Sequence, residues 1–223
     1  IKVIHKKNGG LSDARNYGLE IFKGKYVTFI DSDDYVEYNY VEILYNTLKK
    51  YNVKLSIADN LIKYDSGKII NISSYDEYIV TEKEELELML WGKRDLDNGA
   101  WTKLYERSLF EGVRYPVGRL YEDTATTYKI FSQCDRIAIN SVPIYNYMKR
   151  KDSITQCPFN EKKLQIISAV EEMVDYVKNK YPELCIACER KLIWAYMSTL
   201  SQLATSSTKN KKLQKELIQY VKT

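Results

Sequence analysis

The stretch YVTFIDSDDY, residues 26–35, decides the fold of this 223-residue chain. Its first half is a short run of β-branched and aromatic residues, which predicts a buried strand at residues 26–30. Three carboxylates, Asp31, Asp33 and Asp34, follow at once, and they repel one another unless a cation or hydrogen-bond donors neutralise them. In open α/β sheets the carboxyl ends of strands are where ligands bind. We therefore expect Asp31 and Asp33 to hold a divalent metal through oxygen ligands, which suits Mg²⁺ or Mn²⁺.

These carboxylates allow two other interpretations. The simpler one is an acidic turn that caps the following helix. The other is a calcium loop, because Asp31, Asp33 and Glu42 match its first, third and twelfth positions. However, Tyr35 stands at a ligand position and Val36 replaces the glycine that the sharp turn of such a loop requires. The calcium loop is therefore excluded.

The composition is that of an ordinary globular protein, with 29% charged and 44% hydrophobic residues. The net charge of +4 suits an anionic small substrate or an acidic membrane surface, but it is too small and too scattered for a nucleic-acid-binding face. No apolar stretch approaches the ~18 residues of a membrane span. His5 is the single histidine beside four cysteines, which argues against a zinc site and a Ser-His-Asp mechanism.

Upstream of the acidic stretch, the pattern predicts a strand, a glycine-rich loop and a helix. Residues 1–4 alternate as a strand does, residues 8–10 (Asn-Gly-Gly) can adopt positive φ, and Ser12 or Asp13 would cap the helix. Together with residues 26–30 these elements form a βαβ unit, whose loop and helix amino terminus offer N–H groups to an anion. Arg15 is unfavourable in a first helical turn, so we expect it to face a partner charge.

The remaining chain alternates helices and strands and then becomes helical. We expect helices from Val41 and from Thr81, the latter with a capping box, strands at residues 54–64, 68–72 and 135–147, and helices from residue 160 onward. Pro143 places the strand at 135–147 at a sheet edge. A further helix is predicted over residues 120–132, where Glu122 and Asp123 either cap the helix or supply a general base.

In these residues and motifs, the chain resembles the family-two glycosyltransferases of the GT-A fold, in their bacterial capsule and lipopolysaccharide branch. The resemblance covers residues 1–156. The motifs that carry it are Asn8-Gly-Gly10, Ser12-Asp-Ala-Arg-Asn-Tyr-Gly18, Tyr26-Val-Thr-Phe-Ile-Asp-Ser-Asp-Asp34, Trp101-x-Lys103, Glu122-Asp123 and the stretch from Tyr147 through Arg150 to Ile154. The expected fold is a partial GT-A, Rossmann-like mixed sheet flanked by helices at residues 1–156, followed by a helical appendage at residues 157–223.

The resemblance implies an inverting transfer of a hexosyl group from a nucleotide-diphosphate sugar, with a UDP-sugar favoured, to a hydroxyl of a glycan or lipid-linked acceptor. Asp123 would be the catalytic base, Asp31 and Asp33 would bind Mg²⁺ or Mn²⁺, and Arg15, Asp31 and Arg150 would contact the donor. The expected place of action is the cytoplasm, at the inner face of the membrane, in surface polysaccharide synthesis.

The chain departs from the family pattern at its start. The first two βα units of the family, with their Pro-x-Tyr-Asn and Asp-Asp-Gly-Ser turns, have no counterpart in this sequence. Since one βα unit takes ~30 residues, we expect an amino-terminally truncated chain that lacks at least ~60 residues. Half of the nucleotide site would then be missing, and the uncovered sheet or the helical tail could pair two copies in a homodimer. The alternative function is a non-catalytic binding module that retains the GT-A core.

Overall fold

The structure of the chain is a computed structural model that describes residues 2–92, 98–150, 158–206 and 210–222. Its centre is a seven-stranded mixed sheet in the order β1-β6-β3-β7-β2, with β4 paired to β3 and β5 paired to β7. The pair β3 and β7 is parallel and the other pairs are antiparallel. The strands are β1 (Tyr26–Val27), β2 (Tyr35–Val36), β3 (Leu55–Tyr64), β4 (Ile69–Ile70), β5 (Glu77–Thr81), β6 (Lys103–Glu106) and β7 (Arg136–Lys149).

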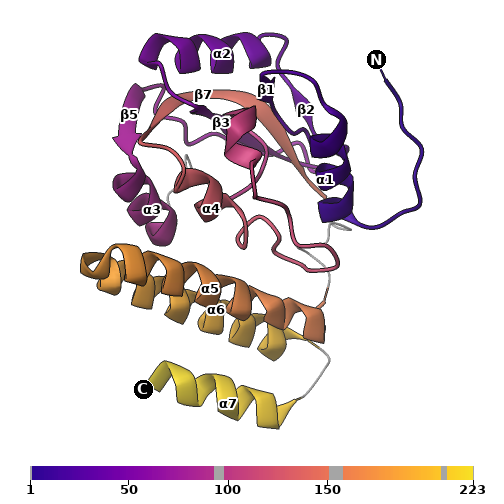
Figure 1. Cartoon of the computed structure of the whole chain (residues 1–223). Helices are drawn as coiled ribbons and strands as arrows, with labels where there is room; N and C mark the ends of the chain where they lie inside the picture. The colour runs from indigo at the N-terminus through magenta and orange to yellow at the C-terminus, as the bar shows by residue number, and fades with distance from the viewer. Residues whose placement is uncertain (1, 93–97, 151–157, 207–209, 223) are drawn as a thin grey trace.

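Helices cover both faces of this sheet (Figure 1). α2 lies over one face, whereas α3 and α4 lie on the other. The neighbouring helices α5 and α6 lie beyond α3 and α4, and α7 is outermost. The helices are α1 (Leu11–Ile21), α2 (Tyr40–Tyr51), α3 (Glu82–Trp91), α4 (Thr127–Phe131), α5 (Gln165–Lys180), α6 (Cys185–Thr205) and α7 (Lys211–Lys222), and short 3₁₀ turns are η2 (Arg107–Phe110), η3 (Glu161–Leu164) and η4 (Pro182–Leu184).

The core follows this layering. Beneath α2, the buried side chains of Tyr40, Leu44 and Leu48 pack on Leu104 and Tyr145 of the sheet. A larger cluster on the opposite face joins the sheet to α3, α4, α5 and α6. This second cluster contains residues from both sides of the boundary expected at residue 156. That boundary itself lies outside the described residues and stays a prediction.

Several local predictions are confirmed. The helix expected from Val41 is α2, and Asn52 caps its carboxyl end in the left-handed conformation (φ 49°) typical of that position. α3 begins with the expected capping box, in which the Thr81 hydroxyl accepts a hydrogen bond from the Glu84 N–H and the Glu84 carboxylate accepts one from the Thr81 N–H. β3 and β4, which fall within the strands expected at residues 54–64 and 68–72, pair as a hairpin around Gly67, whose φ is 83°.

The predicted βαβ unit is wrong. Residues 2–4 form no strand, and the largely exposed segment before α1 runs along the outside of the molecule (Figure 1). The strand expected at residues 26–30 is limited to Tyr26–Val27, which pairs with β6. α1 starts after Gly10 without a side-chain cap, so neither Ser12 nor Asp13 caps it. An alternating pattern forms a strand only where a neighbour accepts its backbone hydrogen bonds, and the described residues offer residues 2–4 none.

Two further predictions are corrected downstream. β7 is an inner strand, with β3 on one side and β2 and β5 on the other; Pro143 is tolerated because it falls where the register of β3 and β7 shifts. The helix expected over residues 120–132 is reduced to Thr127–Phe131. Tyr121 adopts a positive φ of 58°, which interrupts a right-handed helix, and residues 122–126 form turns before α4.

The carboxyl-terminal helices are present as expected. α5 and α6 contribute Val170, Met173 and Cys188 to the larger core cluster, and α7 packs on α6 through Leu217. Within the part of the chain that the structure describes, none of the helices combines the length and the apolar character needed to cross a bilayer.

Candidate active site

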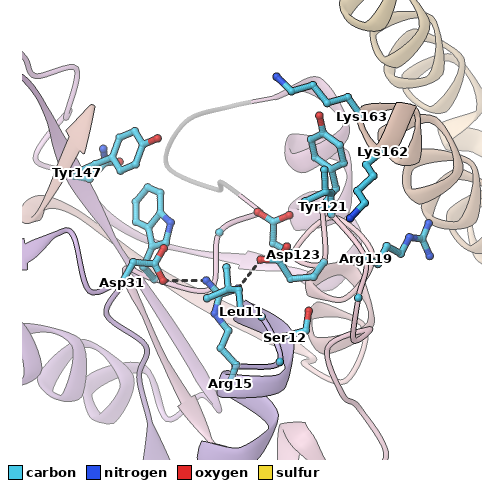
Figure 2. A pocket seen from close by; sticks show the side chains of 18 of the residues that line it. Leu11, Ser12, Arg15, Asp31, Arg119, Tyr121, Asp123, Tyr147, Lys162 and Lys163 are labelled. Atoms are coloured by element: carbon cyan, nitrogen blue, oxygen red, sulfur yellow. Dashed lines mark hydrogen bonds and ion pairs between the residues drawn. The ribbon is translucent and has the colours of Figure 1, made fainter. Parts of the chain in front are cut away.

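A cavity of about 690 Å³ opens beside the sheet, and most of the predicted site residues line it. Its walls come from the start of α1, the segment after β1, the middle of β3, the loop before β6, residues 118–123, β7 and η3. Figure 2 shows Asp31 and Tyr147 on one side of Asp123, and Arg119, Lys162 and Lys163 on the other. Arg15, Asp31 and Asp123, far apart in the chain, therefore share one cavity.

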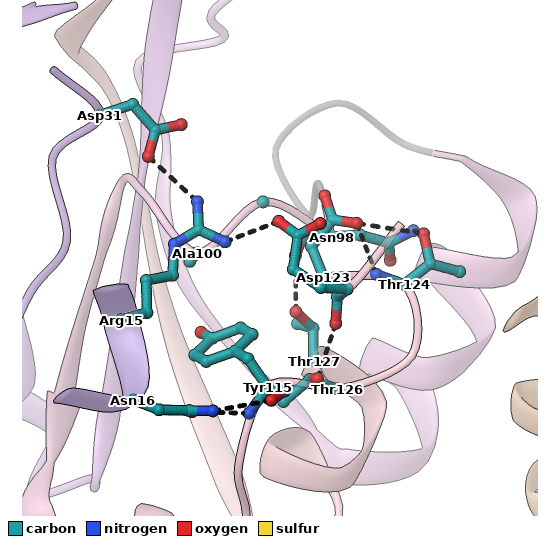
Figure 3. Close-up of polar contacts among 12 residues, drawn as sticks. Arg15, Asn16, Asp31, Asn98, Ala100, Tyr115, Asp123, Thr124, Thr126 and Thr127 are labelled. Atoms are coloured by element: carbon teal, nitrogen blue, oxygen red, sulfur yellow. Dashed lines mark hydrogen bonds and ion pairs between the residues drawn. The ribbon is translucent and has the colours of Figure 1, made fainter. Parts of the chain in front are cut away.

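Arg15 joins two of the acidic segments (Figure 3). Its Nη2 lies 3.0 Å from Oδ1 of Asp31, and its Nη1 lies 2.8 Å from Oε1 of Glu122. The guanidinium also lies over the ring of Tyr115, 5.3 Å from its centroid. Arg15 thus faces partner charges, as the sequence predicts, although it lies in the second turn of α1 and not in the first. It connects the segment after β1 to the turn that carries Asp123.

The ion pairs of Arg15 are shielded from solvent, because only 7% of its side chain is exposed. Burial lowers the pKa of Arg15, but the neighbouring charges, first among them Asp31, outweigh burial and raise the pKa above its ordinary value. The guanidinium is therefore a permanent positive charge at the base of the cavity. Its Nε is buried without a hydrogen-bond partner among the described residues.

Asp123 lies in the turn between residue 118 and α4. Its Oδ1 accepts hydrogen bonds from the N–H of Thr124 at 2.6 Å and from the Thr124 hydroxyl at 3.4 Å. The Thr124 hydroxyl in turn accepts from the amide of Asn98 at 3.3 Å (Figure 3). These contacts orient the carboxyl group, and the left-handed conformation of Tyr121 directs the turn into the cavity.

The three aspartates after β1 have different partners. Asp31 pairs with Arg15, and Asp33 pairs with Arg150 at 3.0 Å on the surface. Asp34 accepts hydrogen bonds from the Tyr145 hydroxyl at 2.7 Å and from the N–H of Met148 at 2.8 Å. Burial raises the pKa of Asp34, and these two hydrogen bonds partly offset the increase. Asp34 therefore ties the acidic segment to β7, while Asp31 and Asp33 remain nearer the solvent.

We propose that Asp31 and Asp33 supply part of the ligand set of a magnesium or manganese ion; of the two, Asp31 lines the cavity and Asp33 lies outside its lining. Their side chains are 26% and 38% exposed, so an ion can reach both, and carboxylates are ligands that these cations prefer. The described residues contain no group of three or more His, Cys, Asp and Glu side chains arranged around one ion. The remaining ligands would therefore be water and a bound phosphate, which is the usual arrangement for Mg²⁺.

Three contributions to the cavity were missed from the sequence. Trp101 stands in a motif of the family resemblance to which no role was assigned; it lines the cavity and stacks on Tyr147 with ring centroids 5.7 Å apart and planes within 6°. Glu122 is an ion-pair partner of Arg15, whereas the sequence indicates it only as a helix cap or a general base. Lys162 and Lys163 enter from the helical region that was regarded as an appendage. Local patterns carry no signal for these contacts, since each depends on tertiary packing.

Comparisons with known proteins identify the family and the fold of the chain. The family described as Glycosyl transferase family 2 matches residues 1–114. GlyA of Streptococcus pneumoniae, a glycosyltransferase, is 29% identical over 86% of this chain, and EpsH of Bacillus subtilis, a putative glycosyltransferase, is 32% identical over 70% of it. The crystal structure of Staphylococcus aureus TarS 1–349 with UDP-GlcNAc superposes with a TM-score of 0.65 at 18% identity, covering 98% of this chain.

The chain is shorter than these proteins. It spans 29% of the length of GlyA, 46% of EpsH and 64% of the TarS structure. The superposition on TarS shows a shared fold, a curled mixed sheet flanked by helices.

Proposed function

Because the chain belongs to glycosyltransferase family 2, we propose that its cavity transfers a sugar from a nucleotide-diphosphate donor to an acceptor hydroxyl, with inversion at the anomeric carbon. The observation that carries the proposal is the position of Arg15. It holds Asp31, a predicted donor and metal residue, and Glu122, the neighbour of the predicted base, in one buried ion-pair network beside the cavity. Donor binding and proton removal would then occur within one site.

Asp123 is proposed as the general base. In a single displacement, the acceptor oxygen forms a bond to the anomeric carbon as the bond from that carbon to the donor phosphate oxygen breaks. The hydroxyl proton moves to the Asp123 carboxylate, and the nucleoside diphosphate leaves with the electron pair. A weak alcohol nucleophile gains typically 10²–10⁴-fold from such a positioned base. The hydrogen bonds from Thr124 that fix one oxygen of Asp123 support this role.

Asp31 and Asp33 would hold Mg²⁺ or Mn²⁺, which when bound supplies positive charge to the departing diphosphate. Arg15 orients Asp31 for this task and contributes a fixed positive charge of its own. Arg150 is placed on Asp33 at the surface, where it could exchange its carboxylate partner for a donor phosphate. Trp101 and Tyr147 present flat aromatic surfaces to the cavity, which suit a sugar ring.

The donor class is proposed from a relative. TarS, which shares the fold, has been crystallised with UDP-GlcNAc and with UDP, so a UDP-sugar is the donor to test first. The names of relatives such as the minor teichoic acid biosynthesis protein GgaB of Bacillus subtilis support a role in surface polysaccharide synthesis. We place this role on the cytoplasmic side of the membrane, on a glycan or lipid-linked acceptor.

The test separates donor binding from transfer. In the protein expressed from its complete gene, Asp123→Asn should leave the Kd of a UDP-sugar with Mn²⁺ within about twofold, measured by calorimetry. Release of UDP in the presence of acceptor should fall at least ~10²-fold, as expected for loss of a general base. Transfer that survives this substitution would exclude Asp123 as the base. Absence of any sugar-nucleotide binding by the unmodified protein would instead favour a non-catalytic module.

A further inference from the structure

Two buried side chains of β6 hold the main chain of the cavity wall at residues 99–101. The ammonium group of Lys103 donates to the carbonyl oxygen of Gly99 at 2.6 Å and, more weakly, to that of Trp101 at 3.5 Å. The hydroxyl of Tyr105 donates to the carbonyl oxygen of Ala100 at 3.0 Å. Three consecutive carbonyl groups of the wall therefore accept hydrogen bonds from side chains of one strand.

Both donors lie behind the wall and not in the cavity. Lys103 and Tyr105 are 0% exposed, whereas Gly99 and Trp101 line the cavity. The strand that carries the two donors is itself fixed in the sheet between β1 and β3. Burial raises the pKa of Glu85 and the charge of Lys103 lowers it, so this lysine also interacts with α3. The wall is thus connected through buried groups to the sheet and to a helix.

The backbone next to the wall has an unfavourable conformation. Thr102 adopts a φ of 60°, which a β-branched residue rarely does. Its hydroxyl donates to the carbonyl oxygen of Trp101 at 2.6 Å, and its own carbonyl oxygen accepts from the N–H of Ala58 at 2.8 Å. Such conformations persist only where the surrounding structure imposes them. We therefore expect the wall to rearrange when its buried donors are removed.

The position of the Trp101 indole depends on this backbone. A Cβ added to Gly99 would lie 2.7 Å from Nε1 of Trp101, so the indole packs directly against the main chain of Gly99. The indole also stacks on two rings of β7, with centroid distances of 4.8 Å to Tyr145 and 5.7 Å to Tyr147. A shift of Gly99 would therefore displace the indole relative to the rings of β7.

We propose that Lys103 and Tyr105 are positioning residues, which keep the Trp101 indole where a sugar ring packs on the cavity wall. The proposal rests on the proposed function, in which this wall meets a sugar. Misplacement of a substrate by about 1 Å can slow a reaction ~10²-fold. Loss of either donor should therefore slow sugar transfer. Binding of UDP should be unaffected, because its proposed ligands belong to other segments of the chain.

The first experiment measures the position of the indole and needs no substrate. The protein from the complete gene is labelled with 5-fluorotryptophan, and the ¹⁹F signal of Trp101 is identified by its loss in Trp101→Phe. Lys103→Met should shift or broaden this signal. Lys191→Met is the matched control, because Lys191 is also buried, donates to the carbonyl oxygen of Met89 at 3.4 Å and does not line the cavity. It should leave the Trp101 signal unchanged.

The second experiment measures transfer, as UDP release in the presence of acceptor, at a temperature at which circular dichroism shows every variant folded. Lys103→Met should lower kcat at least ~10-fold, within the range expected for a misplaced substrate. The Kd of UDP with Mn²⁺ should stay within about twofold of that of the unmodified protein, as expected when only the wall at the sugar moves. Lys191→Met should lower Tm and leave kcat unchanged.

Each outcome decides the proposal. An unchanged Trp101 signal or an unchanged kcat in folded Lys103→Met would overturn it, as would an equal loss of kcat in Lys191→Met. If Lys103→Met does not fold, Tyr105→Phe, which removes a single hydroxyl group, is judged by the same two criteria. If the unmodified protein transfers no sugar, the proposed function fails, and the Trp101 signal alone decides whether these residues position the wall.

Discussion

Replacing Arg15 with methionine should strongly destabilise the protein. The substitution retains an apolar side chain of similar length, but it leaves two carboxylates, Asp31 and Glu122, facing each other across the site. Only 13% of the Glu122 side chain is exposed, so water cannot replace the guanidinium there. Breaking a buried ion pair by removing one partner costs about 3–5 kcal/mol. For a chain of this size this corresponds to a fall in Tm of roughly 6–20 °C.

A double-mutant cycle tests the electrostatic cause of this loss. Glu122→Gln removes the more buried of the two carboxylate charges, so it should recover part of the stability lost in Arg15→Met, with a coupling free energy of roughly 0.5–3 kcal/mol. Urea unfolding followed by circular dichroism measures all four proteins. Lys83→Met, which breaks a solvent-exposed ion pair with Glu183, is the matched control and should leave the unfolding midpoint nearly unchanged. Additive effects of the two site substitutions would refute the proposed coupling.

Three further predictions concern the buried Glu85, the capping box of α3 and the close packing at Gly99. Burial raises the pKa of Glu85 from 4.5 to about 8 despite the nearby charge of Lys103. Between these pH values the folded protein holds a proton on Glu85 that the unfolded chain has released, so the free energy of unfolding should fall as pH rises from about 4.5 to 8 and stay low above pH 8. Glu85→Gln should abolish this pH dependence, measured by urea unfolding at several pH values. Thr81→Ala removes the α3 capping box and should lower the free energy of unfolding by about 1 kcal/mol in the same assay. An unchanged unfolding midpoint would show that the cap contributes nothing to stability. Gly99→Ala should lower the free energy of unfolding by about 1–3 kcal/mol and slow sugar transfer, because the added Cβ would lie 2.7 Å from Nε1 of Trp101. A variant with the Tm and the activity of the unmodified protein would contradict this packing.

The elements that the sequence predicts well are those whose signals are local. α3 has its capping box within four residues, and the β3–β4 hairpin has its turn glycine between two short apolar runs. Residues 1–4 show the same kind of alternation, yet residues 2–4 form no strand, because pairing with a neighbour is not encoded in the pattern itself. The prediction that Pro143 marks an edge strand is wrong for a related reason. A register shift with β3, invisible in sequence, lets an inner strand accommodate a proline.

The candidate site was predictable in its charged residues and unpredictable in their partners. Asp31, Asp123 and Arg15 stand in motifs that mark them as functional, and the structure brings all three to one cavity. The contact of Glu122 with Arg15 joins residues 107 positions apart in the chain. The lysines of η3 reach the cavity only because α5 packs against the larger core cluster. Such contacts follow from the packing of the whole chain and have no local signature.

Locating the metal tests the central claim most directly. Crystals of the protein from the complete gene, grown with Mn²⁺ and a UDP-sugar, would be examined by anomalous scattering at the manganese edge. We predict one peak within coordination distance of carboxylate oxygens of Asp31 or Asp33 and of the donor diphosphate, with the sugar extending toward Asp123. A diphosphate bound elsewhere, with no manganese at these aspartates, would contradict the account.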